Sequence, residues 1–155
     1  MIVDFQIIPH DKQRYETVGD YWWESQPNDD GSYAGLVGRD ASDEGHRWVL
    51  YVRVSKMNNP RYEMLVFHHE LIEALLLRDA GIPEPAAMAW DKEYEIARRV
   101  GHLACGCAIT EDSEPGNDPH APYNAQHRVA TLCEMALANH LGVNWDAYGR
   151  EVNRL

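Results

Sequence analysis

A histidine and a carboxylate recur at helical spacing inside an apolar segment of this chain. His69 and Glu73 are four residues apart within the run from Met64 to Leu77, so both project from the same face of a helix. The rest of that face is apolar, and a buried charge without a partner is unfavourable by several kcal/mol. A bound metal ion compensates both groups, because imidazole nitrogens and carboxylate oxygens are zinc ligands. The spacing therefore predicts metal coordination in the core.

A second segment repeats this arrangement. His127 and Glu134 project along the stripe of a predicted helix that also carries Ala130 and Leu137, and this stripe should face the core. Two such pairs, on helices that pack together, predict one shared site. The candidate metal ligands are His69, Glu73, His127 and Glu134.

The chemistry of such a site depends on Glu70. Residues 69–73 read His-Glu-x-x-Glu, one residue away from the His-Glu-x-x-His helix of zinc hydrolases. Glu70 lies about 100° round the helix from His69 and is the candidate general base for a metal-bound water. Glu134 either joins the metal or orients His127. The pattern favours a hydrolase of peptides or other amides. Zinc is the expected ion, with iron or manganese, in a one- or two-metal site, as alternatives.

Two other functions stay open from the sequence. In the first, the protein is a non-enzymatic binding protein with a structural metal or none, and its aromatic residues Tyr21, Trp22 and Trp23 contact a partner. In the second, the histidines and glutamates form buried hydrogen bonds without any metal. A chelator distinguishes these alternatives, because only a metal-bound fold loses stability when the ion is removed.

Other polar residues are assigned less specific roles. Asp91 and Glu95 lie one turn apart and precede two arginines, which indicates charge pairing on a solvated helix face. His120 and Tyr123 border an acidic loop, and a position at the mouth of a pocket is the less favoured alternative for them. The Cys105-Gly-Cys107 segment has too short a spacer for a zinc knuckle and no second cysteine pair to complete one.

The predicted elements place these residues in an α+β fold. Strands are expected at residues 2–8 and 48–54, with a turn at 17–20 and a loop or hairpin between 25 and 46. Helices are expected at about residues 61–80, 85–100 and 124–141, and a short helix within 144–155. Strands first and helices afterwards predict a single domain over residues 1–155, with N-terminal antiparallel strands followed by about three core helices.

Composition narrows the range of partners. The 155 residues carry a formal net charge of −11, which disfavours direct binding to nucleic acid and to anionic lipid. No apolar run is long enough to span a membrane, and no signal peptide is recognised at the start of the chain. Three cysteines, an odd number, fit a reducing compartment. We therefore expect a cytoplasmic protein, with virion association as an alternative, that acts on an unknown substrate or protein partner.

Several motifs together resemble a family of small proteins encoded by phages and prophages. The matching motifs are Gln13-Arg14-Tyr15-x-Thr17-Val18-Gly19-Asp20-Tyr21-Trp22, Tyr62-Glu63, His69-Glu70-Leu71-Ile72-Glu73-Ala74, Asp91-x-x-Tyr94-Glu95, Pro115-Gly116-Asn117-Asp118-Pro119-x-Ala121-Pro122-Tyr123, His127-x-x-Ala130-x-x-x-Glu134 and Leu141-Gly142-Val143-Asn144-Trp145-x-x-Tyr148. They cover most of the chain, and the resemblance implies a phage or prophage origin without implying an activity. Over one helix the chain also resembles zincin-type metallopeptidases, with Glu73 in place of their second histidine, which implies a zincin-like arrangement.

Overall fold

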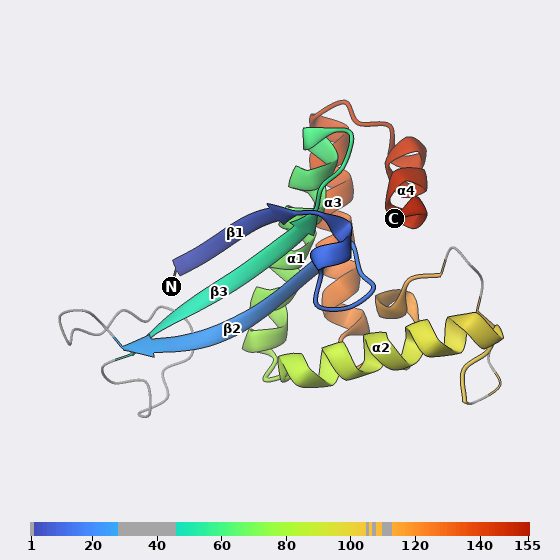
Figure 1. The fold of residues 1–155 in the computed structure, drawn as a ribbon, viewed down its shortest axis with the longest axis horizontal. Helices are drawn as coiled ribbons and strands as arrows, with labels where there is room; N and C mark the ends of the chain where they lie inside the picture. Colours follow the sequence, from blue (N-terminus) through green and yellow to red (C-terminus); the bar gives the residue numbers. More distant parts are fainter. Residues whose placement is uncertain (1, 28–45, 105, 107, 110–112) are drawn as a thin grey trace.

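The protein combines one small β-sheet with four helices (Figure 1). The computed structural model describes residues 2–27, 46–104, 106, 108–109 and 113–155. The strands are β1 (Ile2–Ile8), β2 (Gly19–Pro27) and β3 (His46–Ser55). The helices are α1 (Pro60–Asp79), α2 (Glu84–Val100), α3 (Asn124–His140) and α4 (Trp145–Arg154). The predicted α+β class is confirmed, with strands first and helices afterwards.

The sheet is mixed rather than antiparallel. Its order is β1-β3-β2, so β3 is the central strand. β2 runs antiparallel to β3, with Tyr21 opposite Val52, whereas β1 runs parallel to β3, with Phe5 opposite Val52. The prediction of antiparallel strands was therefore wrong for β1. Alternation along a strand identifies which side chains share a face but carries no information on strand direction.

β2 begins inside the segment that was predicted to be a turn. The strand starts at Gly19 and continues to Pro27, past the point where a loop was expected. The Thr17 hydroxyl donates to the carbonyl of Gly19. Such a local side-chain bond is typical of turn sequences, although here it lies at the start of the strand. The remainder of the predicted loop, residues 28–45, lies outside the described residues.

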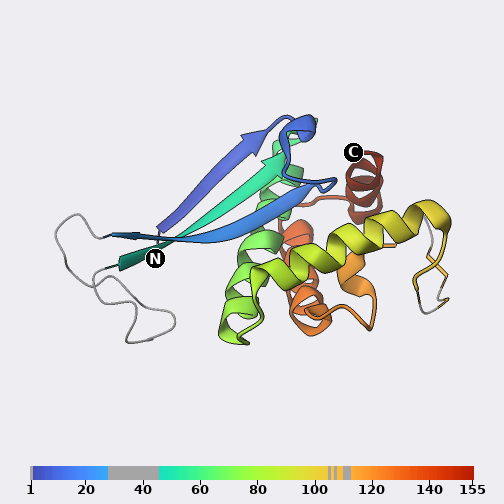
Figure 2. The same ribbon diagram turned by 60° about the horizontal axis from the view of Figure 1, so that its bottom comes forward.

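One face of the sheet and helix α1 form the centre of the core. The side chains of Leu50, Val52 and Val54 on β3 are fully buried, and so is Leu65 on α1. The opposite sheet face has no helix over it in either view (Figure 2). Because burial of apolar area stabilises by about 25 cal/mol per Å², this packing holds α1, which carries His69, against the sheet.

The helices begin and end close to the predicted residues. Asn59 precedes α1 and its side chain accepts from the backbone N–H of Arg61, 3.0 Å away, which fixes the first turn. Gly101 ends α2 with a φ of +83°, a conformation that glycine adopts without strain. α3 lies beside α1 along much of its length, and α2 crosses below both in Figure 1. No helix in the described part of the chain is long and apolar enough to cross a membrane.

Candidate metal centre

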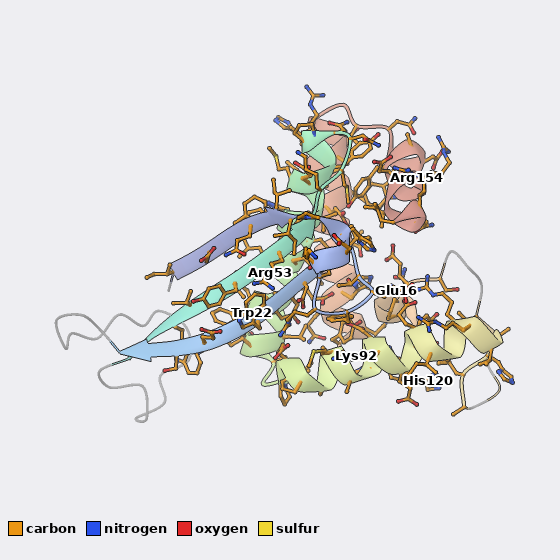
Figure 3. All side chains as sticks on the ribbon, viewed as in Figure 1. Glu16, Trp22, Arg53, Lys92, His120 and Arg154 are labelled. Atoms are coloured by element: carbon orange, nitrogen blue, oxygen red, sulfur yellow. The ribbon has the colours of Figure 1, made fainter. Side chains whose placement is uncertain are left out.

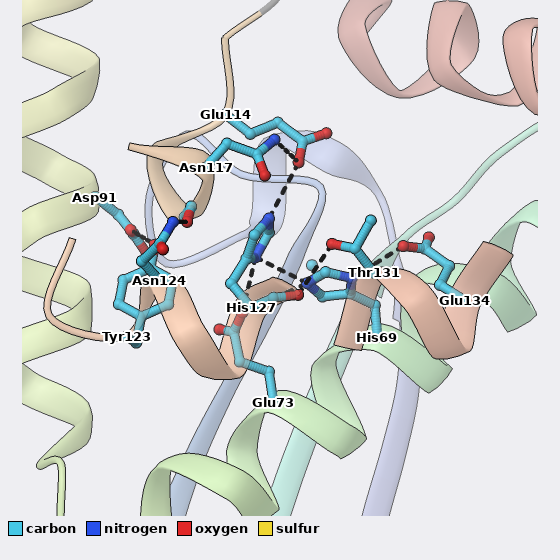
Figure 4. A network of polar contacts seen from close by, with 12 residues as sticks. His69, Glu73, Asp91, Glu114, Asn117, Tyr123, Asn124, His127, Thr131 and Glu134 are labelled. Carbon is cyan, nitrogen blue, oxygen red and sulfur yellow. Dashed lines mark hydrogen bonds and ion pairs between the residues drawn. The ribbon is translucent and has the colours of Figure 1, made fainter. Parts of the chain in front are cut away.

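Helices α1 and α3 bring three ligand atoms to one point. Nδ1 of His127 lies 2.9 Å from Oε2 of Glu73 and 3.1 Å from Nε2 of His69 (Figure 4). Nε2 of His69 and Oε2 of Glu73, one turn apart on α1, are 3.4 Å apart. Both Glu73 and His127 are buried, and the His69 side chain is 12% exposed. The predicted meeting of the two helices in one site is confirmed.

The triangle has the size that a small divalent ion requires. Ligands at about 2.0–2.1 Å from a tetrahedral zinc ion lie about 3.3 Å from one another. The three observed edges, 2.9, 3.1 and 3.4 Å, bracket that separation. His69, Glu73 and His127 can therefore hold a metal ion with little movement of their side chains.

Each histidine has a second carboxylate on the far side of its ring. Nδ1 of His69 lies 2.9 Å from Oε2 of Glu134, and Nε2 of His127 lies 3.3 Å from Oε2 of Glu114. The hydrogen bond between Nδ1 of His69 and Glu134 fixes the imidazole proton on the outer nitrogen of that ring and leaves a lone pair on the inner one. The contact of His127 with Glu114 is an ion pair without hydrogen-bond geometry, since Nε2 of His127 has no hydrogen-bond partner among the described residues. The bond to Nδ1 places Glu134 behind His69, so it lies neither among the three converging atoms nor beside His127, which it was expected to orient.

Glu134 is itself held from α4. The hydroxyl of Tyr148 donates to Oε1 of Glu134, and both side chains are buried. Thus α4 supports α3, and α3 supports the His69 ring on α1. Neither Tyr148 nor Glu114 was identified from the sequence, because each reaches the site only through tertiary packing.

The segment that carries Glu114 is fastened at three points. The Trp90 indole N–H donates to the carbonyl of Pro115 at 3.1 Å, and the Asn124 side-chain amide donates to the carbonyl of Gly116 at 2.8 Å. Gly116 packs directly on the His127 ring, where an added Cβ would lie 2.3 Å from Cγ. This glycine is required because the backbone passes too close to the ring for any side chain.

The charges around the triad compensate one another. Burial alone would lower the pKa of His69, but its contacts with Glu134 and Glu73 raise that pKa well above the usual value. For His127, Glu114 and Glu73 likewise outweigh burial and raise the pKa to about 9. Burial raises the pKa of Glu73, but the two histidines outweigh it and lower that pKa overall. The site is therefore built to place positive charge between these carboxylates, whether protons or a metal ion supply it.

Glu70 lies beside the triad without a partner. Its carboxyl packs against Gly19 on β2, where an added Cβ would lie 2.3 Å from Oε1. No hydrogen bond or ion pair reaches Glu70 from any residue that the structure describes, and burial together with the charge of Glu73 raises its pKa. A carboxyl with a free lone pair and a raised pKa can accept a proton from a nearby water.

These residues line one cavity of about 320 Å³. Asp91 of α2 also faces it and accepts hydrogen bonds from the hydroxyls of Tyr123 and Tyr15, the latter at 3.2 Å. The prediction that Asp91 lies on a solvated helix face was therefore wrong. The sequence spacing predicted charge pairing on this helix, and Glu95 does pair with Arg98 at 2.9 Å. It did not predict that two tyrosines from other segments contact Asp91.

The remaining predicted residues are dispersed. His120 is largely exposed (Figure 3) and bonds to Asp118. Of His120 and Tyr123, only Tyr123 is among the described residues that line the cavity. Tyr21 is buried at the cavity, whereas Trp22, its neighbour on β2, stacks on Tyr51 on the opposite face of the sheet. The aromatic residues named for a binding surface therefore do not form one patch. Cys105 and Cys107 lie outside the described residues.

Comparisons of the chain with protein-family models, with curated proteins and with solved structures find no match.

Proposed function

We propose that this protein is a metal-dependent hydrolase that cleaves peptides or other amides. A divalent ion, most simply zinc, binds to His69, Glu73 and His127. The supporting observation is that three lone-pair atoms converge at tetrahedral spacing, with a carboxylate behind each histidine. The resemblance to phage and prophage proteins belongs to this proposal too, and it makes host or cell-wall amides the first substrates to test.

The number of ligands favours a catalytic over a structural ion. Structural zinc sites are closed by four protein ligands, whereas catalytic sites keep one position for water. Three side chains form this group among the described residues, and the cavity lies beside them. A water molecule in the fourth position would share the cavity with Glu70 and with the substrate. This arrangement also supports a hydrolase over a binding protein with a structural metal.

Glu70 would act as the general base. Its carboxylate takes a proton from the water as the water oxygen attacks the amide carbon. The same proton then passes to the amide nitrogen as the carbon–nitrogen bond breaks, which gives a carboxylic acid and an amine. An ion held by His69, Glu73 and His127 would polarise the carbonyl oxygen and lower the pKa of the water.

Metal content is the first test. We expect about one zinc, iron or manganese ion per chain in the purified protein, measured by elemental analysis, and loss of the ion in both His69→Ala and His127→Ala. His120→Ala is the matched control, because this exposed histidine bonds to Asp118 and lies outside the triad. No ion in the wild type after reconstitution would overturn the proposal.

Turnover is the second test. A panel of fluorogenic peptide and amide substrates should be cleaved by the metal-loaded protein, and Glu70→Gln should lower the rate about 10²–10⁴-fold while the metal is retained. Glu95→Gln is the control, since Glu95 lines the same cavity but is paired with Arg98. Equal rates for Glu70→Gln and wild type would exclude Glu70 as the base.

A further inference from the structure

The carboxylates of the cavity fall into two groups that differ in their partners. One group has arginine partners: Asp20 and Glu84 both contact Arg14, at 2.5 and 3.0 Å, and Glu95 contacts Arg98. Asp91 and Glu70 belong to the other group. No lysine or arginine of the described chain forms an ion pair with either of them. The cavity therefore holds two carboxyl groups that are free to pair with a cationic ligand.

Two tyrosines hold Asp91 in place, although no lysine or arginine of the described chain forms an ion pair with it. Its Oδ1 accepts from the Tyr123 hydroxyl and its Oδ2 accepts from the Tyr15 hydroxyl at 3.2 Å. Each carboxylate oxygen has two lone pairs, so both oxygens can accept one more hydrogen bond. Burial, together with the charge of Glu73, raises the pKa of Asp91 to about 7, although the two tyrosine bonds and the charge of His127 lower it.

A third tyrosine in the same wall differs from Tyr15 and Tyr123, because its hydroxyl has no hydrogen-bond partner among the described residues. This residue is Tyr21, which is 7% exposed. Burial is the largest cause that raises the pKa of Tyr21, and the charges of Glu73, Glu70 and Asp91 follow it. A buried hydroxyl left unpaired is unfavourable by roughly 1–3 kcal/mol. A ligand with a polar group would relieve this, and the aromatic rings of the wall attract cations.

Asp91 and the metal triad line the same cavity. The Tyr123 hydroxyl bonds Asp91, and the charges of Glu73 and His127 are among those that shift the pKa of Asp91. A ligand that reaches both the triad and Asp91 needs a positive group as well as an atom that binds the metal. An amino group on the residue whose carbonyl is cleaved meets this condition.

We propose that the substrate is an amide with a free ammonium group next to the cleaved bond, and that Asp91 binds this ammonium group. The inference rests on the proposed hydrolase function and specifies its substrate class. Tyr15 and Tyr123 hold the carboxylate of Asp91 in position, while Glu70 stays free to act on water. Amides whose amine is acetylated lack the positive charge and are poor ligands.

A pair of metal-binding ligands tests this assignment. Leucine hydroxamate and N-acetyl-leucine hydroxamate share the group that chelates zinc, but only the first has an amino group, which is mainly protonated at about pH 7. Titration calorimetry with the zinc-loaded protein should show that the amine-bearing ligand binds about tenfold more tightly, because a hydrogen bond to a charged group adds roughly that factor.

Two variants assign the preference to one carboxylate. Asp91→Asn should abolish the tenfold preference and leave the affinity for the acetylated ligand within about twofold. Glu95→Gln, a carboxylate one turn away that already has an arginine partner, should retain the preference. A preference that persists in Asp91→Asn would overturn the role of Asp91.

The outcomes separate this inference from the function on which it rests. Equal binding of both hydroxamates to the wild type would overturn the ammonium specificity and leave the metal site intact. Binding of neither hydroxamate would overturn the zinc site, and the substrate class with it. Circular dichroism and thermal unfolding of each variant establish that it is folded before its affinity is measured.

Discussion

Nδ1 of His69 lies 2.9 Å from Oε2 of Glu134, while Nε2 of the same ring faces Glu73 and His127. The two nitrogens of this imidazole thus have different contacts: Nδ1 bonds to a carboxylate that orients the ring, and Nε2 is one of the three converging atoms. Because the Tyr148 hydroxyl donates to the other oxygen of Glu134, the orientation of His69 depends on three helices. An α-helical pattern alone does not specify such a relation.

Substitution Glu134→Gln should weaken metal binding without abolishing it. An amide has one oxygen, whereas the Glu134 carboxylate accepts from His69 with Oε2 and from Tyr148 with Oε1, so one contact is lost. We expect the metal dissociation constant to rise about 10–100-fold. Competition against a fluorescent chelator measures it. Glu93→Gln makes the same charge change at an exposed position, and equal affinities in the two variants would contradict a role for Glu134.

Substitution Gly116→Ala should disturb the site through the His127 ring. The added methyl group would lie 2.3 Å from Cγ of His127, a separation that real structures do not contain, so the ring or the backbone must move. We expect metal affinity and thermal stability both to fall. In Gly149→Ala nothing lies within 4 Å of the added methyl group, and helix propensity predicts a stabilisation of about 0.5–1 kcal/mol. Wild-type behaviour of Gly116→Ala would show that the site tolerates a displaced ring.

Removal of the metal should destabilise the wild type. An ion present at a hundred times its dissociation constant stabilises by about 2.7 kcal/mol, which corresponds to a decrease in Tm of about 5–10 °C on chelation for a domain of this size. In His127→Ala the chelator should have no effect, because a ligand of the triad is missing. A Tm of the wild type that does not respond to chelator would favour the alternative of buried hydrogen bonds alone.

The two helix faces of the site could be predicted from the sequence, but the residues around them could not. His69 with Glu73, and His127 with Glu134, are polar residues at positions where the helical period requires apolar ones. That conflict is visible without a structure. Glu114 lies in a segment without periodicity, and Tyr148 lies on a short terminal helix, so neither has a local pattern that points to the triad.

The sheet shows the same division between local pattern and tertiary arrangement. Partial alternation of apolar residues located β1, and β-branched and aromatic residues located β3. The direction of β1 relative to β3 is not encoded in that alternation, because a free strand edge pairs with a parallel or an antiparallel neighbour. Asp91 was misplaced for a similar reason. Its neighbours on α2 suggest a solvated face, but Tyr15 and Tyr123 come from segments distant in sequence.

The pH dependence of stability should report the environment of Asp91. Burial raises its pKa to about 7 in the folded protein, above the ordinary value of 3.8, so the folded state favours the protonated form. As pH rises from about 4 to about 7, the wild type therefore loses stability relative to Asp91→Asn, at up to about 1.4 kcal/mol per pH unit. Above that window the difference should be constant.

Urea unfolding of both proteins in chelator, at several pH values between about 5 and 8, measures this difference. The chelator eliminates the pH dependence of metal binding. Subtracting one curve of unfolding free energy against pH from the other cancels the contribution of every group that titrates equally in both proteins. Tyr15, Tyr123, Glu73 and His127 are the groups that influence Asp91, and all of them remain in the variant. The comparison of wild type with Glu93→Gln should be flat across the same range. A flat difference for Asp91→Asn as well would mean that Asp91 is ionised throughout and already has a positive partner.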